Sequence, residues 1–300
     1  MNPLKHIKSK LGEMRYNVGF ISTEDITLPQ KERFKKINWI KLGAYKDGWF
    51  ADPFILNVSD EKIELLAEEW IYKDNKGRIS KLVIDKHTYK LLSIVVVLEL
   101  ETHLSFPLIY EENGIIYVCP ENYQSGCVNI YTYDRNTAKL VNPTTIINKP
   151  LIDTQLFKLN GKYYALGVER KTGAMEDTRI LKIYESDSLC GQYKEIQTIE
   201  NTKNIERGAG NIFLWKDRII RPVQNCEGGY GLSTILYELI YKNKEFNETE
   251  LYRIEPNRSS FMGLCLHTFN IKENLCVIDG QEYIYYRLAR TLKKITSIFH

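Results

Sequence analysis

The chain has 300 residues, of which 43% are hydrophobic and 12% aromatic, and its formal net charge is +3. This length suits one large domain or two small ones. The mild, mixed charge, without a zinc, helix-turn-helix or RNA-binding motif, argues against a nucleic-acid partner. Six cysteines without C-x-x-C spacing and the lack of a visible secretory signal favour reduced thiols in a cytoplasmic protein.

The first predicted elements are a basic amphipathic helix over 1–14 and a strand over 15–21. In the helix, three lysines interleave with leucine and isoleucine. No later stretch is apolar for long enough to cross a membrane as a helix, because the longest apolar run is 91–98 and a span needs roughly 18–20 residues.

From residue 50 onward one layout recurs five times: an apolar strand, a short polar turn and a second apolar strand. The repeats align on Asp52, Ser105, Asp153, Ala209 and His267. The steps between these positions are 53, 48, 56 and 58 residues. Turns such as Asn160-Gly161 have hairpin chemistry, and further strand pairs lie between the hairpins. Four strands in each step of about fifty residues is the pattern of a propeller blade.

We therefore predict an all-β fold: one five-bladed β-propeller domain over 1–300 with short terminal helices. The blades are expected at about 50–100, 103–148, 151–200, 207–258 and 263–286. The last is short of strands, and the strand over 15–21 is expected to close it. The stretch 286–300 is again basic and amphipathic. Two roles stay open for the two ends: they cover the bottom of the domain, or they hold the protein at the inner face of a membrane.

Polar side chains recur at one end of the innermost hairpins. A hairpin returns the end of its second strand to the start of its first, so residues about 16 apart become neighbours at the channel mouth. The expected neighbours are Asp52 with Glu68 and Glu69, Ser105 with Glu121, Asp153 with Glu169, Ala209 with Gln224 and Asn225, and His267 with Asp279. Buried charge is costly unless it is paired or solvated, so this cluster predicts a functional site. The other interpretation is a set of ordinary solvated carboxylates.

Carboxylates around a pocket suit glycosidic chemistry, in which one protonates the leaving oxygen and another activates a hydroxyl or attacks the sugar. The candidate catalytic residues are Asp52, Glu69, Glu121 and Asp153. The candidate substrate-binding residues are Arg207, Arg221, Gln224, Tyr230 and His267. The two arginines suit a carboxylated or phosphorylated sugar, or else neutralise the acidic mouth. His267 is either a packed core histidine or the holder of a channel water or cation, and no multi-histidine metal site is expected.

No P-loop, G-x-G-x-x-G, G-x-S-x-G or H-E-x-x-H motif is present. This argues against nucleotide hydrolases, dehydrogenases, serine hydrolases and zinc proteases.

Short motifs in the repeats resemble two groups of propellers. WFADPF at 49–54 and AEEW at 67–70 resemble the first blade of glycoside hydrolase families 43, 32, 62 and 68. HLSFP, CPEN, RPVQN, LHTFN and VIDG more closely resemble the propeller domain N-terminal to the glucosamine inositolphosphorylceramide transferases of plants, and its bacterial relatives near polysaccharide assembly genes. This likeness spans roughly 15–283.

The hydrolase resemblance implies an acid or nucleophile-type aspartate at Asp52 and a second aspartate at Asp153. It also implies a general-acid glutamate in the fourth blade, where this sequence has Ala209 and Gln224 instead. A hydrolase would then need its acid from another blade, such as Glu121 or Glu69, or the reaction is a different one.

We therefore expect a carbohydrate-active enzyme, with a glycosyltransferase-type step in cell-surface polysaccharide or glycolipid assembly as the leading function. A sugar nucleotide or a glycan is the expected substrate, and the basic ends suit a lipid-linked acceptor. The alternatives are a glycoside hydrolase of the family 43 type and a non-catalytic glycan-binding propeller.

Overall fold

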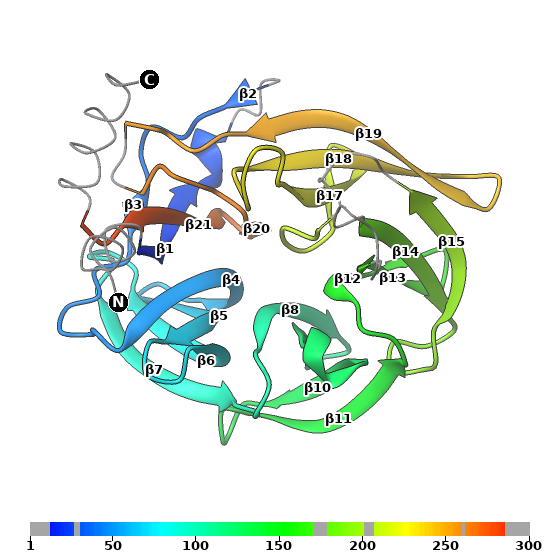
Figure 1. Cartoon of the computed structure of the whole chain (residues 1–300), viewed down its shortest axis with the longest axis horizontal. Coiled ribbons are helices and arrows are strands. Elements are labelled where there is room, and N and C mark those ends of the chain that lie inside the picture. The colour runs from blue at the N-terminus through cyan, green and yellow to red at the C-terminus, as the bar shows by residue number, and fades with distance from the viewer. Residues whose placement is uncertain (1–12, 27–30, 171–178, 201–206, 260–261, 286–300) are drawn as a thin grey trace, which may run out of the picture.

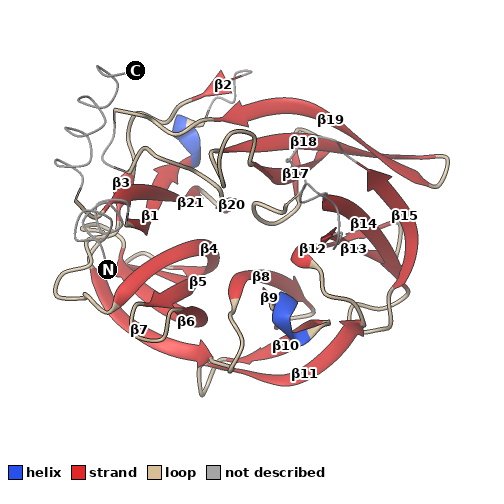
Figure 2. Cartoon of the chain, in the orientation of Figure 1, coloured by secondary structure: helices blue, strands red, loops and turns tan. Residues whose placement is uncertain are grey.

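The structure is a computed structural model, and it describes residues 13–26, 31–170, 179–200, 207–259 and 262–285. Five mainly antiparallel sheets are arranged in a ring around a common axis (Figure 1), which confirms the predicted all-β, five-bladed propeller. In the described ranges, helix occurs only as two short 3-10 turns, η1 (Thr23–Asp25) and η2 (Tyr123–Ser125) (Figure 2), and neither they nor any other described segment forms a helix that could span a bilayer. The helices predicted at the two ends lie outside the described residues, apart from 13–14, where β1 begins.

Four sheets follow the chain in order. The first blade contains β4 (Gly48–Val58), β5 (Lys62–Ile71), β6 (Lys76–Asp85) and β7 (Leu91–Leu98). The second contains β8 (Ser105–Glu112), β9 (Ile115–Glu121), β10 (Val128–Asp134) and β11 (Lys139–Ile147). The third contains β12 (Ile152–Leu159), β13 (Lys162–Arg170), β14 (Arg179–Ser186) and β15 (Lys194–Glu200). The fourth contains β16 (Phe213–Trp215), β17 (Arg218–Asn225), β18 (Ser233–Lys242) and β19 (Glu245–Ile254), with β2 (Lys31–Glu32) parallel to β19.

The fifth blade joins the two ends of the described chain. It contains β20 (Phe269–Lys272), β21 (Leu275–Tyr283), β1 (Met14–Ser22) and β3 (Asn38–Trp39). β1 pairs with β21 in unbroken antiparallel register from Met14–Tyr283 to Ser22–Leu275. The early strand is therefore a member of the last sheet, and the ring of blades closes through main-chain hydrogen bonds.

Neighbouring blades pack through buried apolar side chains. Phe54 of β4 and Phe106 of β8 meet edge to face, with ring centroids 5.0 Å apart. Leu108 and Val118 are fully buried in the same cluster. Burying one such aliphatic side chain stabilises the fold by about 1.5–3 kcal/mol. The apolar alternation that predicted the strands is thus the source of the interfaces between blades, and it leaves the polar strand ends at the channel.

The innermost strand bends at an equivalent place in three blades. Asp52, Phe106 and Asp153 have left-handed backbone, with φ of 48°, 42° and 46°. Each lies in a break of pairing register between the first two strands of its blade. Such a bulge redirects a side chain, and left-handed backbone in a non-glycine residue costs roughly 1–3 kcal/mol. The structural equivalent of the two aspartates is therefore Phe106, one residue beyond the Ser105 on which the sequence repeats align.

Candidate active site

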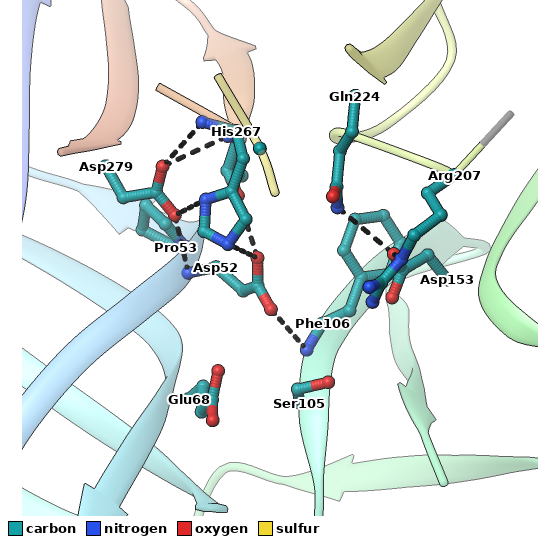
Figure 3. Close-up of polar contacts among 12 residues, drawn as sticks. Asp52, Pro53, Glu68, Ser105, Phe106, Asp153, Arg207, Gln224, His267 and Asp279 are labelled. Carbon is teal, nitrogen blue, oxygen red and sulfur yellow. Dashed lines mark hydrogen bonds and ion pairs between the residues drawn. The ribbon is translucent and has the colours of Figure 1, made fainter. Parts of the chain in front are cut away.

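A cavity of about 540 Å³ lies where the innermost strands begin, and we call it the active-site cavity. Residues from several blades line it: Tyr16, Trp49, Asp52, Glu68, Trp70, Asn75, His103, Ser105, Glu121, Arg207, Tyr230 and His267 are among them. Five predicted site residues are in this set, namely Asp52, Glu121, Arg207, Tyr230 and His267. The hairpin argument thus brings acids and bases from separate repeats to one place, as Figure 3 shows for most of them.

Asp153 and Gln224 lie behind Arg207 and do not line the active-site cavity. Asp153 is almost fully buried, and its Oδ2 is 2.7 Å from Nε of Arg207. Gln224 donates from Nε2 to the same Oδ2 at 3.1 Å and to the carbonyl oxygen of Gly208 at 2.9 Å (Figure 3). The guanidinium of Arg207 also lies over the ring of Tyr230, 5.1 Å from its centroid. Asp153 and Gln224 therefore hold Arg207 at the cavity.

On the opposite side, Asp279 anchors the starts of two blades. Its Oδ2 accepts a hydrogen bond from the backbone N–H of Asp52, and its Oδ1 accepts from those of His267 and Thr268, each at 3.1 Å. Nδ1 of His267 forms an ion pair with Asp279 Oδ2 at 2.7 Å. Asp279 thus ties the fifth blade to the first (Figure 3).

Asp52 continues this chain of contacts toward the second blade. Its Oδ1 accepts from the hydroxyl of Thr268 at 2.8 Å and lies 3.6 Å from Nε2 of His267, and its Oδ2 accepts from the N–H of Phe106 at 3.2 Å. Asp52 is therefore both a wall of the cavity and a bridge between blades. A neutral amide there would give up part of this bonding, so Asp52→Asn is expected to weaken the fold as well as the chemistry.

Burial sets the protonation of this trio. Burial raises the pKa of Asp52 to about 6, with the charge of His267 opposing the rise and that of Asp279 adding to it. Burial also opposes ionisation of Asp279, but the charge of His267 and the hydrogen bonds from His267 and the backbone hold the pKa of Asp279 below its usual range. Burial disfavours charged His267, yet the carboxylate of Asp279 outweighs burial and raises the pKa of His267 to about 9. At neutral pH, His267 is a cation between two carboxyl groups.

The same trio could be considered for a metal ion, since oxygen and nitrogen atoms of Asp52, His267 and Asp279 lie within 4.8 Å of one another. A metal-ligating imidazole must offer a lone pair, so it must be neutral at the ligating nitrogen. Both nitrogens of His267 face carboxylates instead, Nδ1 at 2.7 Å from Asp279 and Nε2 at 3.6 Å from Asp52. The donor set fits an ion-pair network with the imidazolium in the place of a cation.

Glu68 lines the active-site cavity, and the predicted Glu69 does not. Successive side chains of a strand point to opposite faces, so only one of the two can face the channel. Glu69 accepts hydrogen bonds from Ser80 Oγ at 2.6 Å, Arg78 Nε at 2.9 Å and Tyr45 OH at 2.9 Å. The position expected for Glu69 is therefore corrected: it is a paired interior carboxylate of the first blade, and Glu68 is the acid at the cavity.

The surroundings of Glu68 disfavour its ionisation. Burial, followed by the charges of Asp52 and Glu121, raises the pKa of Glu68 well above its usual range. His103 Nδ1 accepts the N–H of Gly77 at 2.9 Å, and burial lowers the pKa of His103. The neutral ring therefore carries its proton on Nε2, which lies 3.7 Å from Oε1 of Glu68. His103 therefore lies beside Glu68, beyond hydrogen-bond distance.

Glycine at 77 is what permits this arrangement. A Cβ on Gly77 would lie 2.5 Å from the carbonyl oxygen of Leu104, 2.6 Å from Oε1 of Glu68 and 2.8 Å from Cε1 of His103. These distances are shorter than van der Waals contact, so any larger residue would displace the histidine, the glutamate or the backbone.

Glu121 is the second acid with a shifted titration. Ser105 pairs directly with Glu121 across β8 and β9, and its hydroxyl donates to the carboxylate at 3.2 Å. The N–H of Tyr123 donates to the other oxygen at 3.0 Å. Burial and the charge of Asp153 raise the pKa of Glu121 to about 7, against the opposing charge of Arg207. Near neutral pH, Glu121 exchanges a proton readily with its surroundings.

Arg221 lies away from the active-site cavity, contrary to expectation. Its side chain is 1% exposed, and it donates from Nε to Gln155 Oε1 at 2.8 Å and from Nη1 to Glu248 Oε1 at 2.7 Å. On β17 its side chain points between the third and fourth blades, where it is a structural ion pair. Glu169, expected beside Asp153, instead lies 3.6 Å from Lys182, partly exposed.

Comparison with known proteins places the chain in a family. The family described as "Glucosamine inositolphosphorylceramide transferase 1, N-terminal" matches residues 38–281. The chain belongs to this family. That finding confirms the resemblance carried by the short motifs of the blades.

Two plant relatives named glucosamine inositolphosphorylceramide transferase 1 show how much of the family's proteins the chain covers. The protein of Oryza sativa subsp. japonica is 26% identical over 209 residues, which is 68% of this chain and 28% of that protein. The protein of Arabidopsis thaliana is 28% identical over 248 residues, which is 77% of this chain and 32% of that protein. The chain thus spans about a third of the length of the curated relatives it matches.

Solved structures share the fold. The α-L-arabinanase of Cellvibrio cellulosa, complexed with arabinohexaose, aligns with a TM-score of 0.53 and 11% identity, over 73% of this chain and 85% of the arabinanase. The exo-β-1,3-galactanase of Phanerochaete chrysosporium, with galactose, aligns with a TM-score of 0.55 and 12% identity, over 80% of this chain and 61% of the galactanase.

Several cavity residues of this family member escaped the sequence argument. Trp49 and Trp70 are direct partners across β4 and β5, and their rings stack with centroids 5.4 Å apart and planes 1° apart. Tyr16 of β1 packs 5.0 Å from both Trp49 and His267, measured between ring centroids. The hairpin rule that placed Asp52 beside Glu68 also places Trp49 beside Trp70, so this pair could have been predicted from the sequence. Tyr16 could not, because nothing local relates β1 to the fifth blade's cavity side.

Proposed function

We propose that this propeller performs a glycosyltransferase-type step in the assembly of a glycolipid or cell-surface polysaccharide, with the sugar bound in the active-site cavity. The observation that carries the proposal is that two carboxyl groups, those of Glu68 and Asp52, line one cavity. Burial raises the pKa of both, that of Asp52 to about 6. The cavity volume of about 540 Å³ suits a small ligand such as a sugar. The names of the plant relatives, glucosamine inositolphosphorylceramide transferase 1, support transfer to a lipid-linked acceptor.

The chemistry assigned to the cavity uses groups of different charge. Above pH 6, ionised Asp52 accepts the proton of an acceptor hydroxyl as that oxygen bonds to the sugar. Glu68 keeps its proton and donates it to the departing oxygen. Arg207, held by Asp153, offers positive charge to a phosphate or carboxylate of the donor. The stacked Trp49 and Trp70 give the sugar ring an apolar face to lie against.

Hydrolysis is the less favoured alternative. Where the hydrolase resemblance implies a general acid in the fourth blade, this chain has buried Ala209 and Gln224, and Gln224 is bonded to Asp153. A non-catalytic glycan-binding propeller is the second candidate, because Asp52, Asp153 and Asp279 all link neighbouring blades. On that interpretation the carboxylates hold the ring together and the cavity only binds.

For its location, the proposal is the cytoplasmic face of a membrane, with a sugar nucleotide as donor. What supports it is the alternation of basic and apolar residues in the sequence over 1–14 and 286–300, which suits an anionic lipid surface.

Thermal shift with UDP-N-acetylglucosamine, UDP-glucose and GDP-mannose tests the donor site first, because a ligand at 100 times its Kd stabilises a protein by about 2.7 kcal/mol. Any donor that binds is then incubated with inositolphosphorylceramide in detergent, and the product is analysed by mass spectrometry. We expect a glycosylated lipid from the natural sequence and from Glu61→Gln, which changes an exposed acid, and none from Glu68→Gln. Hydrolysis of the donor without a lipid product would favour the hydrolase, and binding without any turnover would favour the binding module.

A further inference from the structure

A second cavity, of about 690 Å³, adjoins the active-site cavity. The two share three lining residues, Trp49, Trp70 and Asn75. The stacked tryptophan pair therefore borders both cavities. The second cavity is built from the first and fifth blades, and Met14, Leu42, Tyr45, Tyr72 and Ile284 also line it.

The two cavities differ in chemistry. The active-site cavity has three acids, Asp52, Glu68 and Glu121, and three cations, Arg170, Arg207 and the protonated His267. The second has mainly apolar and aromatic side chains, and its cations Lys46 and Arg15 outnumber its one acid, Glu13.

Two large apolar residues are open to solvent in the second cavity: Met14 is 43% exposed and Tyr72 44% exposed. Exposed apolar side chains gathered beside a polar site mark a binding surface for an apolar group. Polar side chains such as Lys46 and Asn75 line the second cavity beside its apolar and aromatic ones. The cavity can therefore contact both the polar linker and the apolar tail of an amphiphile.

We propose that the second cavity binds the lipid part of a phosphate-linked glycolipid acceptor whose sugar or inositol head enters the active-site cavity. This inference rests on the proposed function and adds the place of the acceptor's apolar end. The phosphate between head and tail passes the tryptophan pair, where Lys46 supplies positive charge; Arg15 is already paired with Glu282 at 2.6 Å.

The two ends of the described chain lie beside the second cavity. The N–H of Ile284 donates to the carbonyl oxygen of Glu13 at 2.9 Å, and both residues line the second cavity. The described chain therefore enters and leaves the propeller here, and the sequence beyond 285 carries two arginines and two lysines. A surface of anionic lipid, from which the acceptor would come, suits such a sequence.

The test compares acceptors that differ only in their tails or only in their heads. Dihexanoyl-phosphatidylinositol, used below its micelle concentration, carries head and tails; glycerophosphoinositol carries the head alone; dihexanoyl-phosphatidylcholine carries the same tails on another head. Calorimetric Kd values are measured for the natural sequence, for Met14→Ser/Tyr72→Ser, and for Leu214→Ser. Leu214 is 75% exposed and lies on β16, away from both cavities, so it is a matched control for losing exposed apolar surface.

We expect the natural sequence and Leu214→Ser to bind dihexanoyl-phosphatidylinositol at least tenfold more tightly than glycerophosphoinositol, a gain of about 1.4 kcal/mol. Met14→Ser/Tyr72→Ser should lose that ratio while its Kd for glycerophosphoinositol stays unchanged. An unchanged ratio in the double variant overturns the tail site and leaves the proposed function standing. Equal binding of the phosphatidylcholine overturns the entry of the inositol head into the active-site cavity. Failure of the natural sequence to bind either inositol compound overturns the tail site and the lipid acceptor together. If the double variant unfolds at a much lower temperature than the natural sequence, Tyr72→Ser alone is used. We expect it to reduce the logarithm of the ratio of the two Kd values by about half.

Discussion

Asp52 in the first blade and Asp153 in the third have the same local backbone structure but different electrostatic surroundings. The two residues occupy equivalent bulges with nearly identical backbone, φ 48° and 46°. Asp153 meets a guanidinium, which is a permanent cation. Asp52 meets His267, whose charge depends on pH, and has its own pKa raised to about 6. The partners from the neighbouring blades therefore differ: Asp153 is paired with a permanent cation, whereas burial raises the pKa of Asp52 against the opposing charge of His267.

Breaking the ion pair between Arg207 and Asp153 is expected to give the largest loss of stability. Arg207→Met would leave Asp153 buried without its ion-pair partner, at a cost of about 3–5 kcal/mol in the free energy of unfolding. Urea denaturation at pH 7 measures the loss. The double variant Arg207→Met/Asp153→Leu should recover part of it, because no unpaired charge remains. A single variant as stable as the natural sequence would show that solvent, and not Arg207, neutralises Asp153.

The ion pair of His267 with Asp279 predicts a pH dependence of stability. Since the folded state raises the pKa of His267 from 6.5 to about 9, its contribution to stability is complete below pH 6.5 and is lost as the pH rises through 9. The free energy of unfolding should fall by up to about 3 kcal/mol over that range. His267→Gln should remove this slope, while His103→Gln, whose ring is already neutral in the folded state, should keep it. Equal slopes for all three proteins would mean that His267 is not the cation.

Asp52→Asn and Asp153→Asn are expected to affect activity differently. Loss of a general base lowers turnover roughly 10²–10⁴-fold, so at least a hundredfold loss of product formation is expected at saturating donor. The variant should also melt earlier, because Asp52 bonds to Thr268 and Phe106 in two other blades. The matched change at the equivalent bulge, Asp153→Asn, should weaken donor binding through Arg207 more than turnover. Near-normal turnover of Asp52→Asn, in protein shown to be folded, would favour the binding module.

The sequence predicted the architecture because the signals for it are local and repeated. Apolar alternation and turn residues recur in every blade, and even the closing strand over 15–21 could be found, since the last repeat lacked partners. The hairpin rule also brought Asp52, Glu121 and His267 to one cavity.

It was less accurate for single side chains. Glu68 and Glu69 are both plausible acids at the end of β5, and only the direction of the strand's pleat shows that Glu69 bonds to Arg78 in the interior. Arg221 and Arg207 likewise look equivalent in the sequence, but one lies between blades and the other at the cavity. Which face of a strand meets the channel depends on bulges such as those at Asp52 and Asp153, which shift the alternation by one residue.

The smallest expected effect concerns Glu68, the third acid of the cavity. Its position depends on the absence of a side chain at Gly77. In Gly77→Ala the new Cβ would overlap Glu68, His103 and the carbonyl oxygen of Leu104, and relief of this overlap should cost about 1–3 kcal/mol of stability. Gly229→Ala is the matched control, since its Cβ would meet only the side chain of Leu232, at 3.3–3.6 Å. Gly77→Ala should also move the alkaline limb of the pH profile of turnover to lower pH, because a displaced Glu68 is better solvated and gives up its proton more easily. His103→Gln should move that limb less, because His103 lies beyond hydrogen-bond distance of Glu68. A profile unchanged in Gly77→Ala would mean that the proton for the departing oxygen comes from elsewhere, and Glu121, with its pKa of about 7, would then be the group to replace next.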